Sequence, residues 1–573
     1  MRTIIRHSSL LLLVIALSAC VTQEQKESKK HTQKPTQTQQ PIHAEQQSQQ
    51  YKDQQIRISR QKAELQARKK LMTAEADSSH VSAFAAPQRI RSGQLLYEPT
   101  LAGETYAELN QNSVKIVTEN PVSTFSIDVD TGAYSNVRRI LNQGLLPTKD
   151  AVRTEELLNY FDYDYAAPAT KEVPFQVNYG MLQSPWNKHK HLLQIGIKAW
   201  EPKSDVQRAD ANLVFLIDVS GSMHSADKLP LLKKSLRMLS KQMTSRDKIS
   251  IVVYAGASGV VLEPTSASNL MAIEGALEQL RAGGSTNGEA GIKLAYNMAH
   301  RGFIKEGINR IILATDGDFN VGIANTERLV ELIERERENG VALSTLGFGT
   351  GNYNDHMMEQ LANKGNGSYS YIDSLLEAKK VLVEELDSQL ITVAKDVKIQ
   401  VEFNPDRVSE YRLVGYENRT LAREDFNNDK VDAGEIGAGH TVTAIYEITL
   451  AESSDKSIDP LRYQTEAKAT TNFSDEIGFV KLRYKQPEGS SSILVSEALT
   501  MDAMTKSEQA TQDLKFAAAV IAFADKLHGG RYIDDFSYTN IQTLVNVGKG
   551  ADKHGLRAEF GQLVKLAEVL SES

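Results

Sequence analysis

The sequence has one cysteine, Cys20, in 573 residues. A single cysteine cannot form a disulfide within the chain, and it cannot supply the several thiolates that a zinc–thiolate site requires. Long apolar runs are also missing, since the runs at Leu10–Leu17 and Phe516–Ala524 hold only eight and nine residues. Neither run is long enough to cross about 30 Å of hydrocarbon, so we expect no permanent transmembrane helix from them.

An excess of basic residues is missing as well. Lys and Arg number 65 against 73 Asp and Glu, and the resulting net charge of −8 argues against nucleic acid as a partner. The sequence contains no nucleophile elbow, no HExxH metal-binding pair and no P-loop, so we expect a protein that is not an enzyme. Apolar residues make up 41% of the chain, which excludes a wholly disordered, collagenous or multi-pass membrane protein.

The N-terminal residues have the composition of a secretory signal. Arg2 and Arg6 precede the short apolar run, and the tetrapeptide Leu-Ser-Ala-Cys follows at 17–20. This order is typical of a signal peptide, which we predict over residues 1–19. The tetrapeptide resembles the bacterial lipobox, and that resemblance implies that Cys20 is lipidated and becomes the mature N-terminus.

The segment that follows, residues 20–90, is predicted to be a flexible tether. Residues 21–70 include 14 Gln, and such polar sequence cannot bury enough apolar surface to offset the entropy lost on folding. Val21, and not Asp, follows the cysteine, and in diderm bacteria this favours sorting to the outer membrane. We therefore expect a protein that is lipid-anchored in the cell envelope, in the outer membrane in preference to the inner one.

The body of the chain changes its hydrophobic pattern three times. In its centre, short apolar runs such as Leu213–Ile217 alternate with amphipathic helical patterns, which predicts a doubly wound, mostly parallel α/β sheet. After it, runs such as Val397–Phe403 alternate with period two, as β-strands do, and the last part reads as helical. The predicted segments are a mixed region with strands at 91–207, the α/β domain at 208–390, a β-rich domain at 391–486 and a helical region at 487–573.

The α/β domain is predicted to be an insertion into the β-rich domain. Two strands expected at 175–179 and 192–200 come just before it, and they would make only a marginal hairpin alone. Pairing with the strands expected within 397–484 would bury their apolar sides. The ends of a doubly wound domain are often close together, which makes such an insertion feasible.

Oxygen-bearing side chains gather where the strands of the α/β domain end. Asp218, Ser220 and Ser222 follow the first buried strand, Thr286 opens a helix, and Asp316 follows a later strand. Ligands of open α/β sheets bind beyond the carboxyl ends of the strands. Because all these donors are oxygens, they suit a hard divalent ion such as Mg²⁺ or Mn²⁺.

These five positions resemble the metal-ion-dependent adhesion site of the von Willebrand factor type A (VWA) domain, which is Asp-x-Ser-x-Ser with a distant Thr and Asp. The resemblance implies that Ser220 and Ser222 bind the metal directly and Thr286 directly or through water. It implies that Asp218 and Asp316 act mainly through bridging waters. An acidic side chain of a protein partner would then complete the coordination.

The flanking segments extend the resemblance to a family of bacterial lipoproteins typified by YfbK. The matching parts are the region around Asp128 and Asp130, the VWA-like centre and the tail around Gly529–Tyr532. The resemblance implies a surface-tethered module that binds an unknown protein through the metal. The alternative is a structural or assembly factor of the envelope in which the metal only stabilises the domain, and a hydrolase is a more distant third.

Two further motifs have simpler explanations than a ligand site. Asp128 and Asp130 could ligate a metal, but their place before a helical pattern favours a role as turn and cap residues. Gly347, Gly349 and Gly351 are one residue short of the dinucleotide-binding spacing and follow a late strand, so we expect no nucleotide. These glycines instead indicate a loop that passes near the metal face.

The lipid anchor can be tested directly. Cys20→Ala is expected to release the protein from membranes or to leave an uncleaved precursor, because stable attachment needs two or three acyl chains on that residue. The measurement is membrane fractionation combined with palmitate labelling. Unchanged membrane association together with no palmitate label on the wild-type protein would contradict the prediction.

Overall fold

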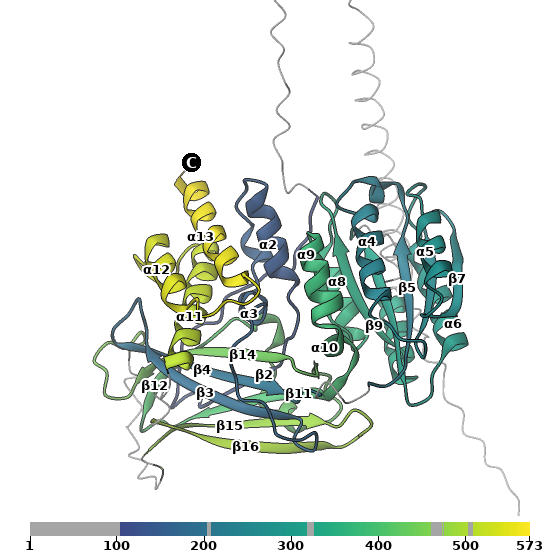
Figure 1. Cartoon of the computed structure of the whole chain (residues 1–573). Coiled ribbons are helices and arrows are strands. Elements are labelled where there is room, and N and C mark those ends of the chain that lie inside the picture. The colour runs from purple at the N-terminus through teal and green to yellow at the C-terminus, as the bar shows by residue number, and fades with distance from the viewer. Residues whose placement is uncertain are drawn as a thin grey trace, which may run out of the picture. The chain divides into compact units, whose positions relative to one another are not determined.

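Three β-sheets organise the part of the chain that the structure describes (Figure 1). The structure is a computed structural model, and it describes residues 103–202, 208–317, 326–459, 473, 475–501 and 508–572. The predicted signal peptide, Cys20 and the predicted tether lie outside the described residues. Among the described helices, none combines the length and the apolarity that crossing a bilayer requires.

The central domain is built on a six-stranded sheet in the order β10-β9-β8-β5-β6-β7. Every neighbouring pair is parallel except β6 and β7, so the sheet is mostly parallel, as predicted. All eight residues of the central strand β5 are buried, because helices cover both faces of the sheet. The strands are β5 (Ala211–Asp218), β6 (Lys248–Tyr254), β7 (Ser258–Ser266), β8 (Ile308–Thr315), β9 (Ala342–Phe348) and β10 (Tyr369–Ile372).

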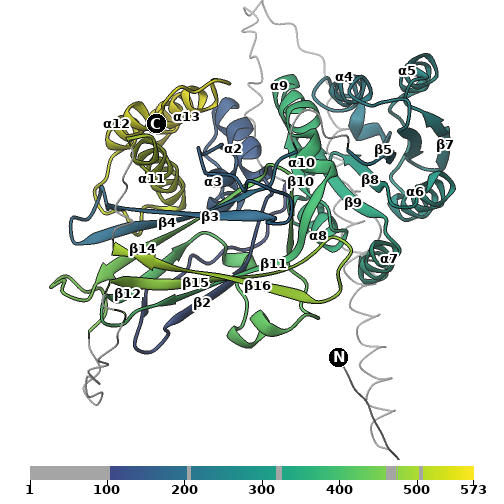
Figure 2. The same cartoon turned by 60° about the horizontal axis from the view of Figure 1, so that its bottom comes forward.

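Two sets of helices cover this sheet, one on each face (Figure 2). Alternate residues of β5 point to opposite sides: Phe215 packs in a core with α4 and α5, whereas Leu216 packs in a core with α6 and α7. The helices are α4 (Leu229–Ser240), α5 (Leu270–Gln279), α6 (Gly288–Gly302), α7 (Thr326–Glu338), α8 (Asp355–Lys364), α9 (Leu375–Lys379) and α10 (Leu386–Leu390).

The α/β domain is inserted into a two-sheet β-domain, as the sequence predicts. Strand β4 precedes the insertion and β14 follows it, and the two pair antiparallel over nine residues. One sheet has the order β1-β12-β14-β4-β3, the other has the order β13-β11-β15-β16 with β2 also paired to β11, and one apolar core lies between them. The strands are β1 (Lys115–Ile116), β2 (Val122–Ser126), β3 (Phe175–Gln183), β4 (Lys190–Ala199), β11 (Thr392–Phe403), β12 (Val408–Val414), β13 (Gly434–Gly437), β14 (Thr441–Leu450), β15 (Glu476–Lys485) and β16 (Ser492–Thr500).

A helical layer covers the other face of the sheet that contains β14. Ile445 of β14 packs into the core of this layer, whereas its neighbours Ala444 and Tyr446 point into the core between the two sheets. Helices from both ends of the described chain form the layer, and α11 contacts α3 while α13 contacts α2. They are α2 (Gly132–Asn142), α3 (Thr154–Asn159), α11 (Glu508–His528), α12 (Tyr538–Gly548) and α13 (Leu556–Glu572).

The predicted helical region at 487–573 begins too early. Residues 492–500 form strand β16, which pairs along its whole length with β15. Its sequence Ser-Ile-Leu-Val is a short apolar run, a pattern that periodicity alone cannot assign to helix or strand. Pairing with β15 determines that this segment is a strand. The helical part described by the structure starts at Glu508.

Buried arginines join the N-terminal helices to the α/β domain. Arg153, 1% exposed, contacts both Glu156 and Asp355 at the start of α8. Arg138 of α2 binds Asp373 at 2.6 Å and Glu377 of α9 at 2.7 Å. The pairs of Arg153 with Asp355 and of Arg138 with Asp373 and Glu377 cross to the α/β domain, so they fix how that domain sits against the N-terminal helices.

Removing one of these arginines is expected to destabilise the protein strongly. Arg153→Met leaves the carboxylates of Glu156 and Asp355 buried without their cation, a change that typically costs about 3–5 kcal/mol in the free energy of unfolding. The matched control is Arg246→Ala, because Arg246 pairs with Asp210 in a partly exposed ion pair worth about 1 kcal/mol or less. Urea denaturation measures both, and equal losses in the two variants would contradict the prediction.

Candidate metal site

The first part of the candidate site is the carboxylate of Asp218 at the end of β5. Its Oδ1 accepts a hydrogen bond from the backbone N–H of Ser220 at 2.8 Å, and its Oδ2 accepts one from the Thr315 hydroxyl at 2.9 Å. Asp218 is fully buried, and this burial raises the pKa of its carboxyl to about 6, with a smaller contribution from the nearby charge of Asp316. The carboxylate is therefore held in one orientation by the two adjacent strands β5 and β8.

The second part is a pair of serine hydroxyls. The hydroxyls of Ser220 and Ser222 are hydrogen-bonded to each other, and their Oγ atoms lie 2.9 Å apart. Ser220 is buried, whereas Ser222 is exposed and belongs to the short 3₁₀ helix η2 (Gly221–His224). Adjacent ligands of an octahedral Mg²⁺, each about 2.1 Å from the ion, also lie about 3 Å apart. The spacing of the two hydroxyls therefore fits two neighbouring ligands of one such ion.

The loop that carries Thr286 lies against the loop that carries the serines. Gly221 N–H donates to the carbonyl of Gly284 at 3.0 Å, and Gly283 N–H donates to the carbonyl of Val219 at 2.8 Å. Gly284 has a φ of +88°, a left-handed conformation that glycine adopts without strain. These contacts bring the half-buried Thr286 to the same edge of the sheet as the serines.

Asp316, the fifth predicted residue, follows β8 and is buried in an ion pair. The Nζ atom of Lys228 donates to its Oδ2 at 2.9 Å. The stem of Lys228 passes over Gly349, where a Cβ atom would collide with it, so the glycine leaves the room that the lysine needs. The glycine-rich loop after β9 thus lies near Asp316 of the candidate site.

Sequence reasoning missed Lys228. Its place before α4 and its spacing from Ser222 match no motif, and its partner Asp316 is 88 residues away. The only related signal was the glycine-rich segment at 347–351. With Lys228 included, the candidate site contains the buried carboxylates of Asp218 and Asp316 and one buried ammonium group.

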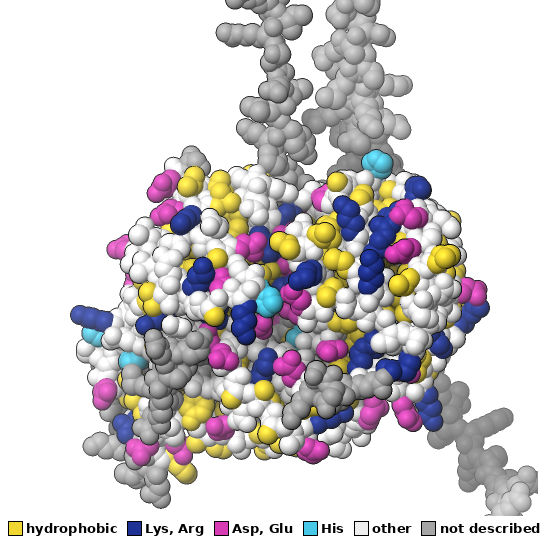
Figure 3. Space-filling view, viewed as in Figure 1, with side chains coloured by type: hydrophobic (Ala, Val, Ile, Leu, Met, Phe, Trp, Pro, Cys, Tyr) yellow, Lys and Arg dark blue, Asp and Glu magenta, His cyan; other side chains and the backbone are white. Residues whose placement is uncertain are grey.

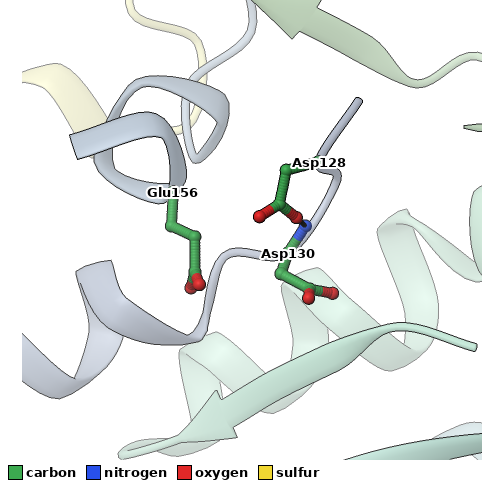
Figure 4. Close-up of side chains that lie close together, drawn as sticks. All are labelled: Asp128, Asp130 and Glu156. Atoms are coloured by element: carbon green, nitrogen blue, oxygen red, sulfur yellow. Dashed lines mark hydrogen bonds between the residues drawn. The ribbon is translucent and has the colours of Figure 1, made fainter. Parts of the chain in front are cut away.

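A second acidic cluster lies outside this site and consists of Asp128, Asp130 and Glu156 (Figure 4). Their carboxylate oxygens lie within 4.8 Å of one another. Burial raises the pKa of Asp130 well above its usual range and that of Glu156 to about 8. Cations of the protein nevertheless occupy the cluster, since Arg419 binds Asp128 at 2.9 Å and Asp130 at 3.2 Å and Arg153 contacts Glu156.

The cluster has a structural role, and the sequence predicted that role only in part. Asp130 N–H donates to Asp128 Oδ1 at 2.9 Å, so the predicted turn is present. The predicted helix cap is wrong, because Thr131 occupies the N-cap position of α2 and its side chain makes no capping hydrogen bond. Instead, Asp130 accepts a hydrogen bond from the backbone of Tyr369 in β10, which ties the turn to the α/β domain.

Three family models match the chain. The model described as von Willebrand factor type A domain matches residues 212–386, and one described as von Willebrand factor matches residues 100–194. The model described as uncharacterized protein YfbK, C-terminal, matches residues 388–570. The central α/β domain, with the candidate metal site at its sheet edge, is therefore a VWA domain.

Similar proteins and structures share different lengths of the chain. A cyanobacterial relative, uncharacterized protein sll0103 of Synechocystis, is 30% identical over 186 residues, 32% of this chain and 43% of its own. Human inter-alpha-trypsin inhibitor heavy chain H3 is 25% identical over 262 residues, 42% of this chain and 29% of its own. The solved structure of von Willebrand factor type A from Catenulispora acidiphila has 15% identity and a TM-score of 0.38, covering 69% of this chain and 91% of its own.

The greatest of these similarities extends over most of the chain. Uncharacterized protein YfbK of Escherichia coli (strain K12) is 49% identical over 474 residues, which cover 82% of this chain and 81% of YfbK. That stretch is long enough to include the VWA domain and sequence from the β-domain around it. The chain belongs to the YfbK family of VWA-domain proteins.

Proposed function

We propose that this protein is a cell-envelope lipoprotein, anchored through Cys20, whose VWA domain binds a protein partner through Mg²⁺ or Mn²⁺. The observation that carries the proposal is the pair of hydroxyls of Ser220 and Ser222, spaced as adjacent ligands of one ion at the edge where Asp218 ends β5 and Asp316 follows β8. The lipobox-like tetrapeptide supports the anchor and, with Val21, the outer membrane.

The charge of the site supports an acidic partner. Two buried carboxylates and the ammonium group of Lys228 carry one net negative charge, so a bound divalent ion gives the site a net positive charge. A carboxylate from a partner neutralises that charge, and it does so most strongly as water is excluded from the contact. The hydroxyls of Ser220, Ser222 and Thr286 are neutral ligands and leave the ion electron-poor.

The accessibility of the site supports binding and not catalysis. Ser222 and the neighbouring His224 are exposed, so a partner can reach the serine side of the site. The two carboxylates are held by Ser220, Thr315 and Lys228 and do not face outward as a general base would.

A second candidate function is a structural factor of the envelope in which the ion only stabilises the domain. The burial of Asp218 and Asp316 favours it, because an ion that satisfies buried carboxylates contributes to folding. The two functions differ in what chelation does. Partner binding is lost without unfolding in the first, whereas the domain unfolds and no partner is found in the second.

Substitution of the first carboxylate tests the metal site. Asp218→Ala is expected to remove the rise in melting temperature that Mg²⁺ produces and to abolish metal-dependent capture of a partner, while the fold is kept because Asp218 is the last residue of β5 and its side chain is outside the apolar cores of the domain. Ser222→Ala changes an exposed hydroxyl and is expected to weaken both effects. Differential scanning fluorimetry with Mg²⁺ and with EDTA measures the first effect, and pull-down with mass spectrometry measures the second.

The matched control is Asp210→Ala, because Asp210 is a partly exposed aspartate at the opposite end of β5. This variant is expected to respond to Mg²⁺ as the wild type does. Partner capture that persists in excess EDTA, or in Asp218→Ala, would show that the metal does not mediate binding.

Lys228 is expected to lower the affinity of the adjacent candidate site for Mg²⁺. Lys228→Met removes a positive charge from Asp316, so the affinity for Mg²⁺ should rise about tenfold. Isothermal titration calorimetry with Mg²⁺ measures this affinity. The control is Lys293→Met, which removes the charge of an exposed lysine on α6 and is expected to leave the affinity unchanged. An unchanged or lower affinity in Lys228→Met would contradict the expected electrostatic role of the lysine.

A further inference from the structure

A groove with an apolar floor runs between α4 and α5 beside the candidate metal site. Its volume is about 350 Å³, and its floor includes the buried side chains of Met223, Leu229 and Leu280. Met223 belongs to the 3₁₀ helix η2, which starts directly after Ser220. The groove is therefore continuous with the loop that carries the two serine hydroxyls.

The rim of this groove is basic, although the chain as a whole is acidic. Figure 3 shows Lys and Arg side chains gathered, with apolar ones among them, where Figure 1 draws α4 and α5. Glu278 alone among the lining residues is acidic, and its side chain is 65% exposed. The basic lining residues are Lys233, Lys234, Arg237 and Arg281.

Glu278 does not neutralise this rim. Its carboxylate contacts Arg237 and lies 3.6 Å from Lys233, so it forms ion pairs with two of the four basic lining residues. Arg281 donates hydrogen bonds to the backbone carbonyls of Glu278 and Leu280, and no carboxylate in the described part of the chain forms an ion pair with it. Lys234 is exposed and makes no ion pair or hydrogen bond with the described residues, so its ammonium group is open to a ligand.

We propose that this groove binds an acidic segment of the protein partner, one that carries an apolar side chain among its carboxylates. The apolar side chain lies on the floor made by Leu229 and Leu280, and the carboxylates pair with Lys234 and the neighbouring cations. This inference rests on the proposed function for one contact only, the carboxylate that reaches the metal. The groove is the second contact, and it determines which acidic segments are accepted.

The chemistry of the groove favours such a peptide over a nucleic acid or an anionic membrane. A phosphate backbone gains affinity from many cations in a row and has no apolar group to cover the floor. Glu278 on the rim repels a continuous line of phosphates, whereas a peptide can place an uncharged residue next to it. Peptide segments that combine apolar anchors with charged flanks are also a common way to fill a helix-lined groove.

The probe is a short fluorescein-labelled peptide in which leucine alternates with pairs of glutamate, and its binding to the full-length protein is followed by fluorescence anisotropy. Lys234→Glu is expected to weaken binding about tenfold, because the substitution turns an attraction into a repulsion. The matched control is Lys188→Glu, which makes the same charge change at an exposed lysine in the turn between β3 and β4. This control is expected to bind as the wild type does.

Different outcomes test the groove and the metal contact. Equal binding by the wild type and Lys234→Glu, equal weakening by the two variants, or no binding of the peptide at all would overturn the groove proposal. Displacement of the peptide by an oligonucleotide or by anionic vesicles at equal charge would also overturn it. Binding that depends on Lys234 but is unchanged by EDTA would leave the groove intact and contradict only the metal contact.

Discussion

The pairing of β4 with β14 is the constraint on which the remaining structure depends. The chain enters the VWA domain after β4 and leaves it through β11, which lies in the second sheet, so the two sheets hold the two ends of the domain. Strands β4 and β14 lie on either side of the VWA domain in the sequence and pair over nine residues in the first sheet. The sheet is buried on both faces, by the second sheet and by the helical layer. The VWA domain is held again where Arg153 binds Asp355, which begins α8 next to Asn354, and the backbone of Asn354 lies against Gly317, the residue after Asp316.

Buried charge is used differently in the two acidic regions of the molecule. Around Asp128 and Asp130, the guanidinium of Arg419 supplies the positive charge, so the region acts as a joint between domains. At the candidate metal site, Lys228 balances only Asp316, and Asp218 is held by hydrogen bonds alone among the contacts described for it. The second arrangement keeps a negative charge that a divalent ion can satisfy, and this difference is the physical basis of the proposed function.

Much of the fold could be predicted from the sequence because the spacing of its apolar residues clearly distinguishes most helices from strands. The apolar run at Leu213–Ile217 alternates with amphipathic helical patterns, which predicts a buried strand, and the site residues follow strand ends, where the topology of a parallel sheet brings them together. Strand β16 could not be predicted, because a short apolar run takes its structure from the neighbour it pairs with. Lys228 and Arg153 could not be predicted either, because their partners lie 88 and 202 residues away.

The central claim is that Ser220 and Ser222 are ligands of one divalent ion. The most direct measurement is a crystal structure of the protein with MnCl₂, in which anomalous scattering locates the ion independently of the refined atoms. If the two serines bind one ion, an anomalous peak is expected within bonding distance of both serine Oγ atoms, with the Thr286 loop beside it. A peak at Asp128 and Asp130 instead, or no peak at the serines at a saturating Mn²⁺ concentration, would contradict the claim.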